Sequence, residues 1–245
     1  MELENKWQRI FSQRAVTFHK PHEISHWTEK GFALRRKKIG KRIRSLYRRG
    51  EGVLDLGSGP GHYASFFQAP VLLDYSLPVL KKAPDGCGGL RLCADFSALP
   101  FRERVFDGVL SVGLLQCRRL KEADLAGLSR VLKPGGWFVV ETLNCEWKGL
   151  LAEMPRAERD RLADFVAGKG DSPCYFVHND FVLYHPDKLK AWFRRAGLLV
   201  TDVEYVYSLC PPPIRLAARV LSDLGARGLS ERELHRSFVL SGRKA

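Results

Sequence analysis

The chain has 245 residues, of which 45% are hydrophobic and 27% are charged, so it can bury a substantial core and is not expected to be disordered. It contains no stretch of about 18 apolar residues and no charged-then-apolar leader, and the acidic start Met1 to Asn5 leads us to expect a cytoplasmic protein without a transmembrane segment. The net charge of +13 is consistent with binding to anionic partners.

The first 50 residues carry most of this charge, with 14 Lys or Arg against four Glu, a net charge of +10. Nine basic residues and no acidic one lie between Arg35 and Arg49. On another face of the same predicted helix, apolar residues recur at helical spacing: Phe32, Ile39, Ile43, Leu46 and Tyr47. Such a helix either packs its apolar stripe on a sheet and leaves the charges in water, or binds RNA, a lipid headgroup or an acidic substrate. We expect residues 1–50 to form a basic helical extension before a main domain of residues 51–245.

Within this extension, His22-Glu23-Ile24-Ser25-His26 matches H-E-x-x-H, which on a helix places two imidazoles one turn apart as zinc ligands. Pro21 directly precedes the first histidine, and no obvious third ligand follows in the next turns. We therefore expect no bound metal. The segment is predicted instead to fold over a pocket and to contribute His19, His22, His26 or Trp27 to its wall, with an ordinary surface helix as the alternative.

Predicted strands then alternate with helix-like segments, a rhythm typical of βαβ units and a mostly parallel sheet. The strands span residues 52–56, 71–74, 90–94, 106–112 and 136–142. A helix over residues 119–132 ends at Lys133-Pro134-Gly135-Gly136. Residues 145–184 form an insertion after the fifth strand, and insertions placed after strand ends shape pockets. A helix at 186–196 and strands at 198–206 and 237–242 complete the pattern.

The first strand runs into a glycine-rich turn, VLDLGSGPG at residues 53–61. Glycine can adopt positive φ and lets backbone N–H groups approach a ligand, while the helix predicted to follow would point its N-terminus at that ligand. The second strand ends at Asp74, whose carboxylate can accept hydrogen bonds from both hydroxyls of a ribose. The third ends at Asp95-Phe96, a carboxylate and a ring that suit an adenine. Together the strand ends predict a nucleoside-type cofactor, whereas the glycines alone are also consistent with a plain tight turn.

Five sequence blocks in this order resemble the class I S-adenosylmethionine (SAM) methyltransferases, in particular the small-molecule group that includes the ubiquinone and menaquinone biosynthesis methylases. The blocks are VLDLGSGPG at 53–61, LLDYS at 72–76, CADFSALPF at 93–101, FDGVLSVGLLQ at 106–116 and LSRVLKPGGWFVVET at 128–142. The dehydrogenase pattern G-x-G-x-x-G is not met, because His62 stands where its third glycine would be, which argues against NAD. The resemblance implies an α/β fold with a doubly wound, mostly parallel seven-stranded sheet, an antiparallel last strand, and SAM as the cofactor.

The resemblance also implies which positions contact the cofactor. Asp55, Gly57, Gly59 and Gly61 would surround the methionine part, Asp74 with Tyr75 beside it the ribose, Asp95 and Phe96 the adenine, and Ser111 to Leu115 would lie under the sulfonium.

Methyl transfer from a sulfonium is an in-line displacement, for which alignment matters most and a general base is optional. The best polar cluster for a base is His178, Asn179 and Asp180 in the insertion, near Tyr175 and Tyr184, with His22 as a further candidate. A solvent-facing polar loop is the alternative for that cluster.

The six cysteines, at positions 87, 93, 117, 145, 174 and 210, include no C-x-x-C pair and are predicted to be reduced thiols. Cys117 and Cys145 are expected to pack or to line the pocket. We predict a monomeric or homodimeric methyltransferase that acts on a small organic molecule. An RNA methyltransferase that uses the helix of Arg35 to Arg49, and a non-catalytic scaffold with the same fold, are the alternatives; no recognisable RNA-binding module is attached.

Overall fold

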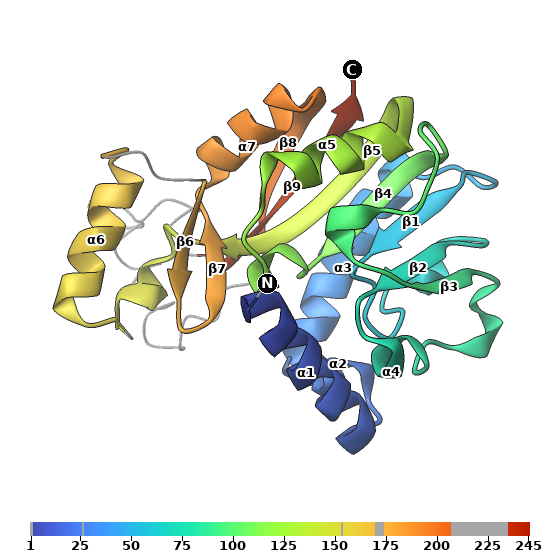
Figure 1. Cartoon of the computed structure of the whole chain (residues 1–245), viewed down its shortest axis with the longest axis horizontal. Helices are drawn as coiled ribbons and strands as arrows, with labels where there is room; N and C mark the ends of the chain where they lie inside the picture. The colour runs from blue at the N-terminus through green and yellow to red at the C-terminus, as the bar shows by residue number, and fades with distance from the viewer. Residues whose placement is uncertain (1, 26, 153, 170–173, 207–234) are drawn as a thin grey trace, which may run out of the picture.

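A nine-stranded sheet runs through the described part of this computed structural model, which comprises residues 2–25, 27–152, 154–169, 174–206 and 235–245 (Figure 1). Five parallel strands lie in the order β3-β2-β1-β4-β5: β1 (Val53–Leu56), β2 (Val71–Asp74), β3 (Leu90–Cys93), β4 (Phe106–Val112) and β5 (Leu132–Asn144). β9 (Ser237–Lys244) pairs antiparallel with β5, and β8 (Leu198–Val206) pairs antiparallel with β9. These seven strands confirm the predicted mostly parallel sheet with an antiparallel last strand.

Strand β5 extends beyond the predicted 136–142 at both ends, because Leu132 pairs with Phe106 of β4 and its last two residues pair with a further strand. Trp137 to Leu143 pair with β9, while Leu143 and Asn144 pair in parallel with β7 (Phe181–Tyr184). β7 forms an antiparallel hairpin with β6 (Tyr175–His178). The predicted insertion therefore extends the sheet by two strands at the carboxyl end of β5.

Helices cover both faces of the sheet, because the central strands are apolar on both sides. α3 (Glu29–Leu46) lies on one face, where Ile39 and Ile43 are buried in a cluster that includes Leu110 of β4. α5 (Glu122–Val131) and α7 (Pro186–Arg195) lie on the other face, where Phe193 shares a cluster with Val109, the preceding residue of β4. Since full burial of one such side chain contributes about 1.5–3 kcal/mol, these two clusters stabilise the scaffold that positions the strand ends.

The N-terminal extension places α1 (Glu2–Thr17) and α2 (Pro21–Ile24) at the carboxyl edge of the parallel strands, near α4 (Leu77–Leu80) and the β6–β7 hairpin (Figure 1). In the insertion, α6 (Arg156–Val166) packs with the hairpin in an apolar cluster around Trp147 and Phe165. Short 3₁₀ helices connect these elements: η1 (Ala64–Phe66), η2 (Asp85–Cys87), η3 (Phe96–Ala98), η4 (Leu115–Cys117) and η5 (Lys148–Ala152). Among the described residues, none of the helices has the length and apolar character needed to cross a membrane.

Candidate functional site

The glycine-rich turn after β1 has the backbone conformation that the sequence predicts. Gly57, Gly59 and Gly61 have φ values of +69°, +57° and +72°, a region that residues with a Cβ rarely adopt. A Cβ on Gly57 would lie only 2.8 Å from the Cβ of Leu114, so this position is also closed sterically. The helix predicted after the turn does not form as an α-helix; the connection from the turn to β2 contains only the three-residue 3₁₀ helix η1.

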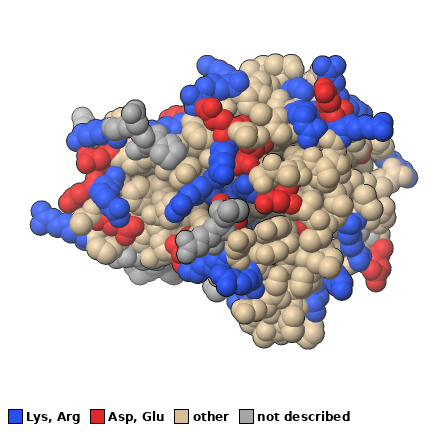
Figure 2. Space-filling view, in the orientation of Figure 1, with Lys and Arg blue, Asp and Glu red and all other residues tan. Residues whose placement is uncertain are grey.

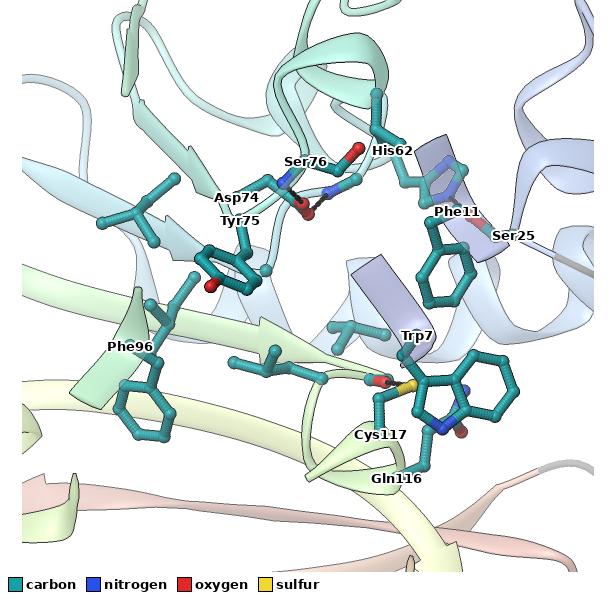
Figure 3. Close-up of a pocket in the computed structure, with 18 of the residues that line it drawn as sticks. Trp7, Phe11, Ser25, His62, Asp74, Tyr75, Ser76, Phe96, Gln116 and Cys117 are labelled. Carbon is teal, nitrogen blue, oxygen red and sulfur yellow. Dashed lines mark hydrogen bonds between the residues drawn. The ribbon is translucent and has the colours of Figure 1, made fainter. Parts of the chain in front are cut away.

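Asp74 ties the glycine turn to the end of β2. Its Oδ2 accepts a hydrogen bond from the Gly59 N–H at 2.9 Å, and its Oδ1 accepts one from the Ser76 N–H at 2.9 Å (Figure 3). Burial raises the pKa of this carboxyl, although the hydrogen bonds from Ser76, Gly59 and Tyr75 oppose the shift. The Asp74 carboxylate therefore links the end of β2 to the glycine turn that follows β1.

A cavity opens at these strand ends beneath α1 and α2 (Figure 3). The sheet contributes the ends of β1, β2 and β3 and the segment after β4, and the N-terminal extension contributes an aromatic wall. From the sheet come Leu56, Gly57, Gly59, Asp74, Tyr75, Asp95, Phe96, Gly113, Leu114, Gln116, Cys117 and Arg118. From the extension come Trp7, Phe11, Ile24, Ser25, Trp27, Phe32 and Arg35.

The structure brings most of the predicted cofactor residues to this one cavity: Gly57, Gly59, Asp74, Tyr75, Asp95 and Phe96. Asp55, Gly61 and Ser111 are not among the residues that line it. Asp55 is 1% exposed, and its Oδ2 has no hydrogen-bond partner among the described residues. Burial, and next the neighbouring charge of Asp74, raise the pKa of Asp55 to about 8. Ser111 is likewise buried in the middle of the sheet.

Asp95 and Phe96 share their end of the cavity with Arg118, a residue that the sequence did not single out. Asp95 accepts hydrogen bonds from the Ser97 N–H at 2.8 Å and from Arg118 Nη1 at 3.2 Å. Partial burial raises the pKa of Asp95, but these two donors outweigh it and the pKa is lowered overall. Arg118 also pairs with the buried Asp124 at 3.3 Å, and its guanidinium lies 4.9 Å from the centre of the Phe96 ring. Asp95 is therefore held as a carboxylate in a fixed orientation.

The basic residues from Arg35 to Arg49 were predicted to face solvent or an anionic partner, and this prediction is wrong for Arg35. It is only 2% exposed, lines the cavity, pairs with the buried Glu141 and lies over the ring of Trp27 at 3.2 Å. The reason is its position on α3: Arg35 is one turn before Ile39 and so shares the buried face.

The remainder of the basic helix is partly neutralised. Arg42 pairs with Asp202, and Lys38 lies 3.6 Å from Glu204, both on β8. On the face of the molecule in Figure 2, which is the side of the sheet away from α3, basic and acidic side chains are interspersed. Lys37, Lys41 and Arg44 remain exposed on α3.

The cavity wall does not include the predicted bases His178, Asp180 and His22. His178 is buried in the insertion, with Nδ1 at 3.0 Å from Glu158 Oε1 and Nε2 at 3.0 Å from Asn179 Nδ2. Asp180 pairs with Lys6 at 2.5 Å. The sequence pointed to His178 and Asp180 because polar residues gather there. It does not show that α6 supplies the partner of His178 and α1 the partner of Asp180. His26 lies outside the described residues.

The imidazole of His62 lines the cavity, whereas the sequence pattern marks this residue only as a departure from the dehydrogenase motif. Its Nε2 lies 2.5 Å from Ser25 Oγ, so α2 is tied to the glycine turn (Figure 3). Burial, followed by the charges of Arg35 and Arg36, lowers the pKa of His62 to about 3, so its ring is neutral near pH 7. The sequence signal for the aromatic wall was the i, i+4 pair Trp7 and Phe11, which predicts one face of a helix.

Two further expectations concern metals and thiols. In the described ranges, no three His, Cys, Asp or Glu side chains are grouped so as to hold a metal ion. Cys117 lines the cavity, and burial raises the pKa of its thiol well above the usual range, so it stays protonated. Cys145 is buried in the apolar cluster of the insertion.

Comparisons with known proteins agree with this geometry. A family model described as a methyltransferase domain matches residues 54–140. The ubiquinone/menaquinone biosynthesis C-methyltransferase UbiE of Enterobacter sp. (strain 638) is 31% identical over 182 residues, which cover 64% of this chain and 69% of the relative. Solved structures share the fold, among them two SAM-dependent methyltransferases.

One is a SAM-dependent methyltransferase from Thermotoga maritima, described as a possible histamine N-methyltransferase (TM-score 0.61, 18% identity, covering 97% of this chain and 99% of that one). The other is a SAM-dependent methyltransferase from Leishmania major (TM-score 0.65, 12% identity, covering 99% and 83%). Since the chain carries a methyltransferase domain and is 31% identical to a C-methyltransferase over 69% of that relative's length, it belongs to the class I SAM-dependent methyltransferases.

Proposed function

We propose that the cavity beneath α1 and α2 binds SAM and that the enzyme transfers its methyl group to a small organic acceptor held against the aromatic wall. The observation that carries this proposal is the position of Asp74, which is bonded to the glycine turn and lines the same cavity as Tyr75, Asp95 and Phe96. Carboxylates and rings at adjacent strand ends match the hydroxyls and the base of a nucleoside. In this proposal residues 1–50 act as a lid, and the insertion of 145–184 lies on the acceptor side.

In this proposal, different parts of the cavity wall hold different parts of SAM. Asp95 and Phe96 would hold the adenine and Asp74 the ribose hydroxyls. The absence of a Cβ at Gly57, where it would press against Leu114, leaves a cradle for the methionine part. We assign Arg35 to the methionine carboxylate, because a guanidinium matches a carboxylate in both charge and geometry. SAM supplies a methyl group on a positively charged sulfonium.

On the acceptor side, the chain's contribution is alignment and exclusion of water rather than proton removal. Trp7, Phe11 and Phe32 present rings to the cavity, and α1 lies over it. A neutral His62, bonded through Nε2 to Ser25, adds no charge to the wall of the cavity. A roof and aromatic walls favour a small molecule, which must fit beneath α1 to meet the methyl group in line.

The two alternatives predicted from the sequence make different demands. An RNA acceptor would use the exposed cations of α3, such as Lys41 and Arg44. A non-catalytic scaffold would have no use for a carboxylate at Asp74 aimed into a cavity. Measurements of SAH binding and of methyl transfer distinguish the RNA acceptor and the scaffold from the proposed function.

The first test is calorimetric titration with S-adenosylhomocysteine (SAH), the demethylated product, and with NAD. We expect SAH to bind and NAD not to bind. Asp74→Ala should weaken SAH binding at least about tenfold, since each hydrogen bond to a charged acceptor contributes about 1.5–3 kcal/mol. Asp74→Asn keeps one acceptor oxygen for the glycine turn and should show a smaller loss.

Asp160→Ala, an exposed carboxylate on α6, is the matched control and should leave SAH affinity unchanged. Unaltered affinity in Asp74→Ala would overturn the site assignment. The acceptor itself is found by incubating the protein with a metabolite extract and SAM carrying a tritiated methyl group, and identifying the labelled product. No labelled product above that of Asp74→Ala would contradict the proposed transfer.

A further inference from the structure

The lid helix α1 is fastened to the tip of the β6–β7 hairpin by three contacts. Lys6 Nζ lies 2.5 Å from Asp180 Oδ2, and the Trp7 indole N–H donates to the Asp180 carbonyl at 2.9 Å. The Trp7 ring also packs on Phe181, with ring centres 4.8 Å apart. Residues separated by more than 170 positions in the chain are thus joined at one point.

The hairpin tip is a fixed support for these contacts. Asn179 and Asp180 have φ values of +46° and +65°, as the two central residues of a tight type I′ hairpin turn require. The preceding His178 is bonded to Glu158 of α6 at 3.0 Å, which ties the tip to the rest of the insertion. Asp180 therefore presents its carbonyl and carboxylate to α1 from a defined position.

The neighbouring residues of α1 reach the cofactor side of the cavity. Gln8 Nε2 donates to the Tyr75 carbonyl at 2.9 Å, and Ser12 Oγ lies 2.8 Å from Ser76 Oγ. Tyr75 and Ser76 directly follow Asp74, whose carboxylate holds the glycine turn. α1 therefore spans the cavity from the hairpin tip to the strand end that carries Asp74.

We propose that Asp180 is a positioning residue, which holds α1 closed over the cavity and so makes the insertion set the rate at which cofactor product leaves. This inference rests on the proposed function, because it takes the cavity to be the SAM and SAH site. Its mechanism is gating: SAH beneath α1 leaves when the helix opens, and each contact to Asp180 opposes opening. The same contacts hold the Trp7 indole in the cavity wall.

The test is a double-mutant cycle with Lys6→Met and Asp180→Asn. Asn is well tolerated at positive φ, so the second change leaves the turn unstrained. The dissociation rate of SAH is measured by stopped-flow tryptophan fluorescence, and amide hydrogen exchange of residues 2–17 is followed with and without SAH. We expect each single variant to raise the dissociation rate about two- to fivefold, the range for an exposed ion pair, and the double variant to add little more. Exchange should rise in α1, with unchanged thermal stability.

The matched control is Lys169→Met with Asp164→Asn, an exposed ion pair at 2.9 Å in the same insertion that does not touch α1. It should leave both readouts unchanged. Multiplicative effects of Lys6→Met and Asp180→Asn, or wild-type exchange in α1 of both variants, would overturn the inference. If wild-type protein fails to bind SAH, the proposed function fails, whereas the exchange of α1 in the ligand-free variants still decides whether Asp180 holds the helix.

Discussion

Asp55→Asn should abolish a pH dependence of stability that arises from one buried carboxyl. Asp55 is 1% exposed on β1, and burial together with the charge of Asp74 raises its pKa from 3.8 to about 8. Unfolded chains release this proton near pH 4, whereas the native protein keeps it to about pH 8. Between these values the native state binds more protons than the unfolded state, so the free energy of unfolding falls as the pH rises.

The magnitude follows from the shift. A group that is protonated only in the native state changes the free energy of unfolding by about 1.4 kcal/mol per pH unit. From pH 5 to pH 7, the wild-type protein should therefore lose roughly 3 kcal/mol through Asp55 that the Asn variant does not lose. Urea denaturation of both proteins at pH 5, 6 and 7 measures the difference, because all other titrating groups are common to the pair. Parallel pH profiles for the two proteins would refute the reasoning, and Asp160→Asn, at an exposed site, should follow the wild type.

Gly57→Ala should destabilise the protein by about 1–3 kcal/mol in calorimetry and weaken SAH binding, because it introduces a clash at positive φ, whereas Gly127→Ala on α5, which has open space around it, should not. Comparable stability of the two variants would show that the turn tolerates a side chain. Addition of EDTA should change neither the melting temperature nor methyl transfer, and stoichiometric zinc by elemental analysis would contradict our assignment of residues 22–26. Binding to bulk tRNA near physiological salt should be weak; under the RNA alternative its log-log salt slope would be about −0.7 per neutralised phosphate and would shrink in Lys41→Gln with Arg44→Gln. Labelled methyl groups in purified tRNA, absent with Asp74→Ala, would favour the RNA alternative.

The sequence by itself determined those features that depend on local backbone chemistry. The strands at 71–74 and 106–112 have their predicted bounds, because short apolar runs between turn residues have few other ways to be buried. The strand at 198–206 also has its predicted bounds. The three glycines of the turn were identifiable because positive φ is a property of the residue itself. Asp74 was identifiable because it directly follows the apolar residues Val71 to Leu73, which mark the end of a parallel strand.

Tertiary structure decided which polar groups meet. Arg35 belonged to a run of similar cations in the sequence, and only the packing of α3 on the sheet separates it from Lys41 by burying it beside Glu141. His178 and Asp180 were predicted as a catalytic cluster, but the fold pairs His178 with Glu158 of α6 and Asp180 with Lys6 of α1, away from the cavity wall. The cavity wall combines residues from the extension, the turn and the segment after β4. Such groupings depend on contacts between residues far apart in the chain, whose energies no local pattern records, and so only the folded arrangement assigns each side chain its neighbours.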